Sequence, residues 1–387
     1  MGYESFYKKS FFAKNRDFTF FSGLKSIFPE KRGVTDATHR PAFSIFYSTM
    51  TADELFNRLN KIQPGAVLCH YTREKVEQML PLINEINERK KDQDTVILAH
   101  SYCAPEIVLG VADYTGDSYK LSEDATKVPQ KTILFSAVRF MGETAKILSP
   151  EKDVLIPGTL TGCSLADSIT GKDVQALREK YPEHAFICYI NTTADVKAAC
   201  DVCVTSGNVM KIVEAYPNDK ICFVPDKLMG QNIKNEMESR GVKKDIVLYN
   251  GSCYVHETYD AELSQFFRSQ NPGLKVVSHP ECNPSAAFYS DFVGSTGQMV
   301  KYIADLPSKS KVLLLTECGL NARMHYEHPD MEFIGSCSMC KYMKSNSLEN
   351  ILETLRHPEK ANRVELDEDT RVKAKKCIDA MFHYANL

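Results

Sequence analysis

A weak internal repeat constrains the fold of this chain more than any other feature. Three short apolar runs, which begin near residues 95, 185 and 275, each end in a pair of polar side chains about 90 residues after the previous pair. The pairs are His100 with Tyr102, Tyr189 with Asn191, and His279 with Glu281. Self-similarity at a fixed period usually reflects a structural unit that is repeated.

Each repeat continues with three further strand-like runs separated by helical segments. The second run starts at Asp113, Asp201 and Asp291 in turn. Short apolar strands that alternate with helices indicate a parallel sheet covered on both faces. We therefore predict an α/β fold of three similar α/β/α units with parallel four-stranded sheets, related by a pseudo-threefold axis around a central active site. The alternative is three tandem domains with unrelated loops.

The repeat also predicts how the chain is divided. An N-terminal extension, partly disordered, is expected at residues 1–70, repeats at 71–165, 166–253 and 254–345, and closing helices at 346–387. The first 32 residues are rich in Phe and in basic side chains but lack the apolar core of a secretory signal. They are expected to be a poorly ordered extension or a basic targeting leader.

Composition excludes several classes of protein. The net charge of -3 gives no reason to expect binding to nucleic acid or to an anionic membrane. No apolar run approaches the roughly 20 residues that span a bilayer. The 13 cysteines are spread over all 387 residues, unlike those of a small disulfide scaffold. Reduced thiols in a reducing compartment, the cytoplasm, are expected.

One cysteine follows the fourth run of each repeat, and these three are the candidate metal ligands. Cys163, Cys253 and Cys340 are separated by 90 and 87 residues. Three protein ligands leave a metal one open position, which is typical of catalytic sites, and an open metal can act as a Lewis acid. Spacing alone does not distinguish zinc in a lyase from a [4Fe–4S] cluster.

Two Cys-x-x-Cys pairs offer a competing four-cysteine site for a non-enzymatic iron–sulfur protein. Cys200 and Cys203 form one pair, and Cys337 and Cys340 form the other. The insert between the pairs is far longer than a zinc knuckle, and packing explains the first pair. Cys337 is also a candidate redox neighbour of Cys340, since a disulfide between them would withdraw a metal ligand.

Several long motifs resemble the quinolinate synthase family in order and spacing. They include residues 99–107 (AHSYCAPEI), 112–118 (ADYTGDS), 138–148 (VRFMGETAKIL), 162–167 (GCSLAD), 225–230 (PDKLMG) and 253–256 (CYVH). The resemblance covers about residues 75–387. It implies the threefold fold and one [4Fe–4S] cluster per chain, held by Cys163, Cys253 and Cys340.

The resemblance also implies a reaction. Iminoaspartate condenses with dihydroxyacetone phosphate to give quinolinate, phosphate and two waters, as a step of de novo NAD biosynthesis, and the open iron assists dehydration. Both substrates are small molecules. L-aspartate oxidase is a candidate partner that would supply the imine.

By resemblance, Glu281 is the expected base, Tyr102 and Tyr189 are the expected acids, and His256 serves the metal or the substrate. The residues expected to bind the anionic substrates are His100, Ser118, Asn191, Ser206, His279, Ser295 and Thr296. Plain helix N-caps are the alternative for the hydroxyl residues. Ser101, Cys103 and Ser136 depart from the common family pattern, and Cys103 is the position to check for an alternative ligand.

Overall fold

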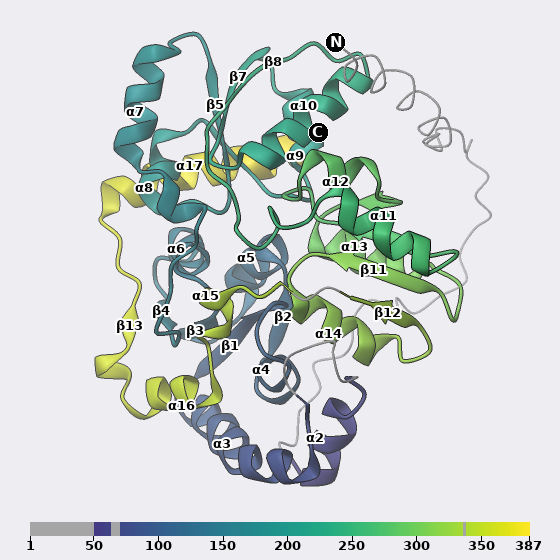
Figure 1. Cartoon of the computed structure of the whole chain (residues 1–387). Coiled ribbons are helices and arrows are strands. Elements are labelled where there is room, and N and C mark those ends of the chain that lie inside the picture. Colours follow the sequence, from purple (N-terminus) through teal and green to yellow (C-terminus); the bar gives the residue numbers. More distant parts are fainter. Residues whose placement is uncertain (1–49, 63–69, 336–337) are drawn as a thin grey trace, which may run out of the picture.

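The computed structural model describes residues 50–62, 70–335 and 338–387. Three sheets surround a common centre, and helices cover each of them (Figure 1). The first 49 residues of the predicted extension lie outside the described residues. Among the described residues, no helix is long and apolar enough to cross a membrane.

Each unit runs helix–strand four times, and the order of elements is the same in all three. The first unit contains α3 (Arg73–Asp92), β1 (Thr95–His100), α4 (Pro105–Gly110), β2 (Tyr114–Gly116), α5 (Ser118–Lys127), β3 (Thr132–Ser136), α6 (Arg139–Leu148) and β4 (Asp153–Ile156). The second contains α7 (Gly171–Lys180), β5 (Ala185–Tyr189), α8 (Ala194–Ala199), β6 (Val202–Val204), α9 (Val209–Ala215), β7 (Lys220–Val224), α10 (Lys227–Ser239) and β8 (Asp245–Leu248). The third contains α11 (Ala261–Gln270), β9 (Lys275–Ser278), α12 (Pro284–Phe288), β10 (Phe292–Val293), α13 (Thr296–Ala304), β11 (Lys311–Leu315), α14 (Cys318–Glu327) and β12 (Glu332–Ile334).

The three sheets share one topology, which confirms the predicted fold class. Their strand orders are β2-β1-β3-β4, β6-β5-β7-β8 and β10-β9-β11-β12, and all these pairs are parallel. The inner strands β1, β5 and β11 are almost completely buried because helices cover both faces of each sheet, which is why they read as continuous apolar runs. One difference is β13 (Asn362–Arg363), which adds an antiparallel fifth strand beside β4. The exact unit boundaries stay a prediction.

A repeated aspartate begins the second strand run of each unit and has a structural role. Asp113, Asp201 and Asp291 each accept a hydrogen bond from a backbone N–H near the start of the neighbouring strand, at 2.8, 2.7 and 2.9 Å. Each also pairs with a cation, Lys90, Arg178 or Arg268, from the helix that precedes that strand. The aspartate therefore joins helix, strand and turn in every unit, and this explains its recurrence.

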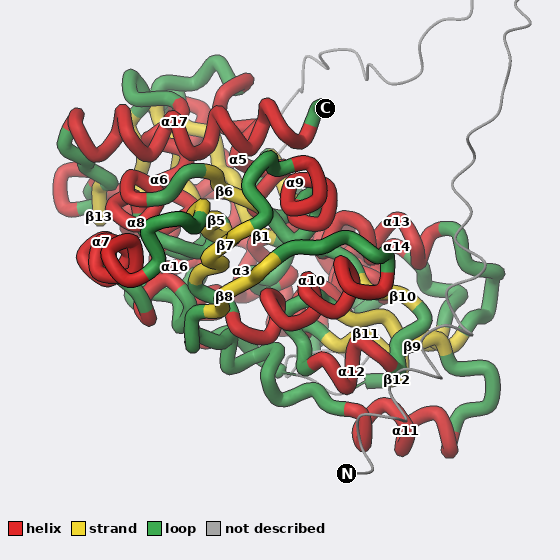
Figure 2. The backbone as a smooth tube through the Cα atoms, turned by 90° about the horizontal axis from the view of Figure 1, so that it is seen from above, coloured by secondary structure: helices red, strands yellow, loops and turns green. Residues whose placement is uncertain are grey.

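The remaining helices close the structure. α2 (Ala52–Leu59) starts with a capping box between Thr51 and Glu54 and buries Leu55 and Leu59. α15 (Lys341–Lys344) follows Cys340, and α16 (Leu348–Arg356) packs on α3. The C-terminal helix α17 (Glu368–Ala385) lies along α6, α8 and the second sheet (Figure 2). Short 3-10 turns occupy Ala166–Ser168 and Pro358–Lys360.

Candidate active site

One cavity with about 700 Å³ of empty space lies at the carboxyl ends of strands from all three units. Its walls include thirteen predicted site residues: His100, Tyr102, Ser118, Cys163, Tyr189, Asn191, Ser206, Cys253, His256, His279, Glu281, Thr296 and Cys340. Ser295 does not line it, because its hydroxyl caps α13 by accepting from the backbone N–H of Gln298. Because side chains of all three units line this one cavity, the alternative of tandem domains with unrelated loops is excluded.

Glu281 connects side chains of the second and third units in the cavity wall. Its Oε1 accepts a hydrogen bond from the Tyr189 hydroxyl at 2.6 Å, and its Oε2 lies 2.9 Å from His256 Nδ1. Burial alone would raise the pKa of Glu281, but the neighbouring His256 and the hydrogen bond from Tyr189 outweigh burial and lower it to about 2. Glu281 is therefore a carboxylate at neutral pH.

Thr316 extends this network into the first unit. Its hydroxyl lies 3.0 Å from His256 Nε2 and 2.7 Å from the Tyr102 hydroxyl. Tyr102 in turn lies 3.1 Å from the Thr296 hydroxyl. Burial raises the pKa of Tyr102 well above its usual value, so the phenol stays protonated. A continuous path of exchangeable protons therefore links Glu281 to Tyr102.

His100 and His279 occupy equivalent positions and make equivalent contacts. The Nδ1 of His100 accepts from the backbone N–H of Tyr102 at 3.1 Å, and the Nδ1 of His279 accepts from the N–H of Glu281 at 3.3 Å. Burial lowers their pKa values to about 4 and about 3. Both rings are neutral with the proton on Nε2, and each offers that N–H as a donor.

The second unit contributes an unpaired acceptor. The Oδ1 of Asn191 is buried and has no hydrogen-bond partner among the described residues. A buried acceptor without a partner costs free energy unless a ligand supplies a donor. Asn191 follows Tyr189 by two residues, as Glu281 follows His279, so its position in the cavity wall is the one that the repeat predicts.

The three predicted metal ligands sit in equivalent backbone settings. The sulfur of Cys163 accepts from the N–H groups of Leu165 and Ala166, two and three residues further along the chain. Cys253 does the same with Val255 and His256, and Cys340 with Tyr342 and Met343. Such N–H groups stabilise thiolates, the form that binds metal.

The electrostatics of the cysteines also favours a bound cation. Burial raises the pKa of Cys163 to about 12, and the charge of Cys340 adds to this. Burial likewise raises the pKa of Cys253, with contributions from Glu281 and Cys163. Buried thiolates that repel one another need a positive charge, and a metal cluster supplies it. The three sulfurs line one cavity and their charges interact, but they do not all lie within 4.8 Å of one another, so the donor set suits a cluster of several atoms better than a single ion.

A second possible ligand set overlaps the first. The ligand atoms of Cys253, His256 and Glu281 lie within 4.8 Å of one another. His256 Nδ1 is 3.3 Å from Cys253 Sγ as well as 2.9 Å from Glu281. His256 thus connects the cysteine site to the proton path.

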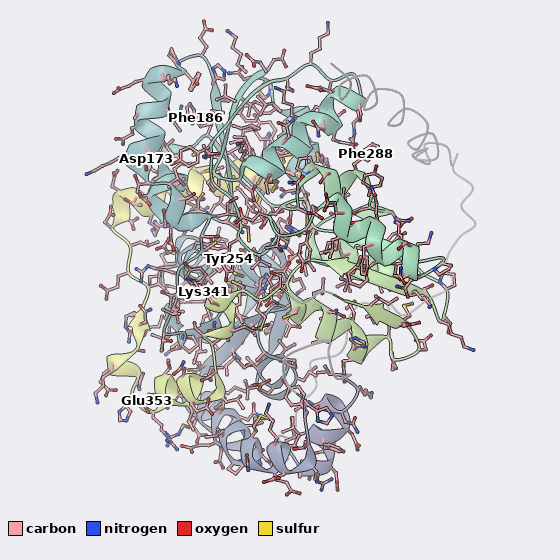
Figure 3. The ribbon with its side chains drawn as sticks, viewed as in Figure 1. Asp173, Phe186, Tyr254, Phe288, Lys341 and Glu353 are labelled. Atoms are coloured by element: carbon pink, nitrogen blue, oxygen red, sulfur yellow. The ribbon has the colours of Figure 1, made fainter. Side chains whose placement is uncertain are left out.

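The segment that holds Cys340 is fixed by contacts with the third unit. Glu317 Oε1 accepts from the Cys340 backbone N–H at 3.2 Å and lies 3.0 Å from Lys344 Nζ. The backbone N–H of Lys341 donates to the Tyr254 hydroxyl at 2.6 Å, and Figure 3 shows these two residues near the middle of the molecule. Sequence reasoning missed Glu317 and Thr316, although both end the third strand run of their unit.

The competing cysteine site is not assembled in the described residues. Cys200 and Cys203 lie in the core of the second unit, whereas Cys340 lines the cavity. Cys337 lies outside the described residues. Cys103 does not line the cavity; its thiol donates to the Ser136 carbonyl at 3.1 Å.

Comparisons with known proteins point to one family. A family model described as "Quinolinate synthetase A protein" matches residues 84–383. The chain is 42% identical over 299 residues to a quinolinate synthase of Xylella fastidiosa, covering 77% of this chain and 86% of that protein. It is 42% identical over 275 residues to one of Sinorhizobium fredii, covering 71% and 75%. For one of Agrobacterium fabrum the identity is 38% over 332 residues, covering 86% and 92%.

Proposed function

The chain belongs to the quinolinate synthetase A family, and from that premise we propose that it condenses iminoaspartate with dihydroxyacetone phosphate. The products are quinolinate, phosphate and two waters, and the pathway is NAD biosynthesis. One observation carries the proposal: a single cavity combines three equivalent cysteines with the Tyr189–Glu281–His256 network.

We propose that Cys163, Cys253 and Cys340 hold one [4Fe–4S] cluster. Three cysteines leave one iron without a protein ligand, and such an iron supplies Lewis-acid assistance for the loss of hydroxide. The backbone N–H groups around each sulfur and the burial of all three thiols support this assignment.

The substrates carry carboxylate and phosphate groups, and the cavity offers donors for them. The N–H groups on Nε2 of His100 and His279 are free to donate. Ser118 and Thr296 are the first residues of α5 and α13, where backbone N–H groups and the helix dipole favour anions. The unpaired Oδ1 of Asn191 accepts from an imine or hydroxyl hydrogen.

Proton transfer is assigned to the hydrogen-bonded side chains. Glu281 is a weak base while its carboxylate interacts with His256 and Tyr189. A substrate carboxylate beside it raises the pKa of Glu281 by like-charge repulsion. It then accepts a proton from carbon or nitrogen. Tyr102 and Tyr189 remain protonated because they are buried, so they donate to leaving oxygens.

A zinc lyase is the second candidate, since Cys253, His256 and Glu281 together resemble a zinc ligand set. One experiment distinguishes the two candidate functions. The protein is purified without oxygen, its iron, sulfide and zinc are measured, and it is supplied with the two substrates. Quinolinate formation that follows iron content supports the proposal. Zinc in place of iron, or no quinolinate from an iron-loaded protein, would overturn it.

A further inference from the structure

A second group of cysteines lies outside the active-site cavity. Cys188 on β5, Cys203 on β6 and Cys377 on α17 are fully buried, and Cys200 between α8 and β6 is 9% exposed. All four belong to the core that packs the C-terminal helix against the second unit. Neither the proposed cluster nor the proton path uses them.

Cys188 lies at the centre of this group. Its sulfur is 3.6 Å from the sulfur of Cys377, although the two residues are 189 apart in the sequence. Cys203 lies opposite Cys188 in the register of β5 and β6. Cys200 and Cys203 lie close enough to Cys188 to lower the pKa of its thiol. One thiol is therefore in reach of three others.

The surroundings favour a reactive Cys188. Burial opposes its thiolate form, but hydrogen bonds from the three neighbouring thiols and the charge of Lys197 outweigh burial and lower the pKa of Cys188. Lys197 is itself buried and is held by the Ile190 carbonyl at 2.9 Å. Thiolates, not thiols, attack disulfides, so this arrangement prepares Cys188 for exchange.

The spacing of the four sulfurs favours a disulfide over a single tetrahedral metal ion. Among the described residues, the group of Cys253, His256 and Glu281 is the one whose ligand atoms all lie within 4.8 Å of one another. No three of Cys188, Cys200, Cys203 and Cys377 meet that condition. A tetrahedral metal needs all four sulfurs close together, whereas a disulfide needs only one close pair.

We propose that Cys188 and Cys377 form a reversible disulfide that fastens α17 to β5, with a low-molecular-weight disulfide such as oxidised glutathione as the oxidant. Cys200, the least buried of the four, gives its proton to the Cys188 thiolate, attacks the oxidant and releases one thiol. Cys188 attacks the mixed disulfide on Cys200 and releases the second thiol. Cys377 then attacks the Cys188 sulfur and frees Cys200. Two protein thiols are oxidised, and the oxidant is reduced to two thiols that take up the two protons.

The disulfide would make docking of the C-terminal helix depend on redox state. α17 is held by packing against α6, α8, α9 and β6, and by hydrogen bonds from Arg371 to the Ile147 carbonyl and from Lys211 to the Ala385 carbonyl. These contacts are all non-covalent, so the helix can open locally while the disulfide is absent. Cys188 directly precedes Tyr189 on β5, so the same bond would fix the strand that carries an active-site acid.

The test uses the full-length chain in anaerobic glutathione buffers of defined ratio. After equilibration the free thiols are alkylated, and the linked peptides are identified by mass spectrometry. The expected result is a Cys188–Cys377 link that increases with oxidised glutathione and disappears with dithiothreitol. The midpoint of thermal unfolding should rise as the link forms. This titration needs no variant and no quinolinate assay, so its failure is distinct from failure of the proposed function.

Three variants sharpen the result. Cys377→Ala should abolish the link and the rise in the unfolding midpoint, and Cys200→Ser should slow formation of the link about tenfold without changing its final yield. Cys222→Ser is the matched control, because Cys222 is buried in the same sheet on β7 but lies outside the group. Thiols that stay reduced at every ratio, a Cys200–Cys203 link instead, or one tightly bound zinc that protects all four would each overturn the proposal.

Discussion

The hydroxyl of Tyr189, at the end of β5 in the second unit, donates to Glu281 of the third unit over 2.6 Å. The bond crosses a boundary between units, so neither unit has an active site by itself. Thr316 carries the same network to Tyr102 of the first unit. The side chains that we propose as acids and bases are therefore brought together by the threefold arrangement, as the cysteines are.

The first prediction concerns Glu281. Glu281→Gln should lower the turnover number for quinolinate by roughly 10²- to 10⁴-fold, because the amide cannot accept the proton. Steady-state kinetics under anaerobic conditions measures this, with iron content as the control for an intact site. A Glu281→Gln protein with full turnover would refute the assignment of the base.

The second prediction separates helix capping from substrate binding. Ser295→Ala should cost about 1 kcal/mol of stability, because the capping box of α13 is lost, and should leave turnover nearly unchanged. Thr296→Val should lower turnover, because Tyr102 loses a hydroxyl partner in the cavity. Urea unfolding and kinetics on both variants test this, and a larger kinetic effect at Ser295 would contradict the geometry.

The third prediction concerns the repeated aspartates. Asp113→Ala should lower the free energy of unfolding by about 3–5 kcal/mol, because the Lys90 side chain, 5% exposed, loses its carboxylate. Asp201→Ala should cost roughly 1–2 kcal/mol, since the Arg178 side chain is 37% exposed.

The control for these variants is Asp379→Ala, which breaks an exposed pair with Lys375 on α17 and should cost less than about 0.5 kcal/mol. Denaturant unfolding measures the three variants. Equal losses of unfolding free energy on replacing Asp113, Asp201 and Asp379 would show that burial does not determine how much each ion pair stabilises the protein.

Much of the fold could be predicted because the repeat copies local patterns. The polar pairs at His100, Tyr189 and His279 marked the carboxyl ends of β1, β5 and β9 correctly, since parallel strands place those ends on one edge. The sequence showed that the Asp recurs, but it did not predict which cations pair with it. Lys90, for example, lies on a helix 23 residues before its partner.

The rest depended on contacts between distant segments. β13 has two residues and shows no alternation of apolar and polar side chains. The sequence therefore did not predict a fifth strand beside β4. Thr316 became part of the site only through contacts with His256 and Tyr102, which lie 60 and 214 residues away. The closeness of Cys188 to Cys377 likewise follows from the docking of α17 and from no local signal.

The fourth prediction is a dependence of stability on pH. The pKa of His100, about 4, lies below the ordinary value of 6.5 because the ring is buried. As the pH falls below about 6.5, the unfolded chain binds this proton first, so stability is lost between pH 6.5 and 4.

Denaturant unfolding of the wild-type protein and of His100→Gln at several pH values measures this contribution. The variant should lose roughly 3 kcal/mol less than the wild-type protein on going from pH 7 to pH 4. Parallel curves for the two proteins would mean that His100 is not kept neutral by its surroundings.

The central claim is that Cys163, Cys253 and Cys340, one from each loop after the fourth strand run, bind one iron–sulfur cluster together. The most direct measurement is the iron and sulfide content of the anaerobically purified protein and of its three single Cys→Ser variants, with Cys222→Ser as the control. We expect one [4Fe–4S] cluster per chain in the wild-type and control proteins and a severe loss in each of the other three. Full cluster content in any of those three variants would contradict the account.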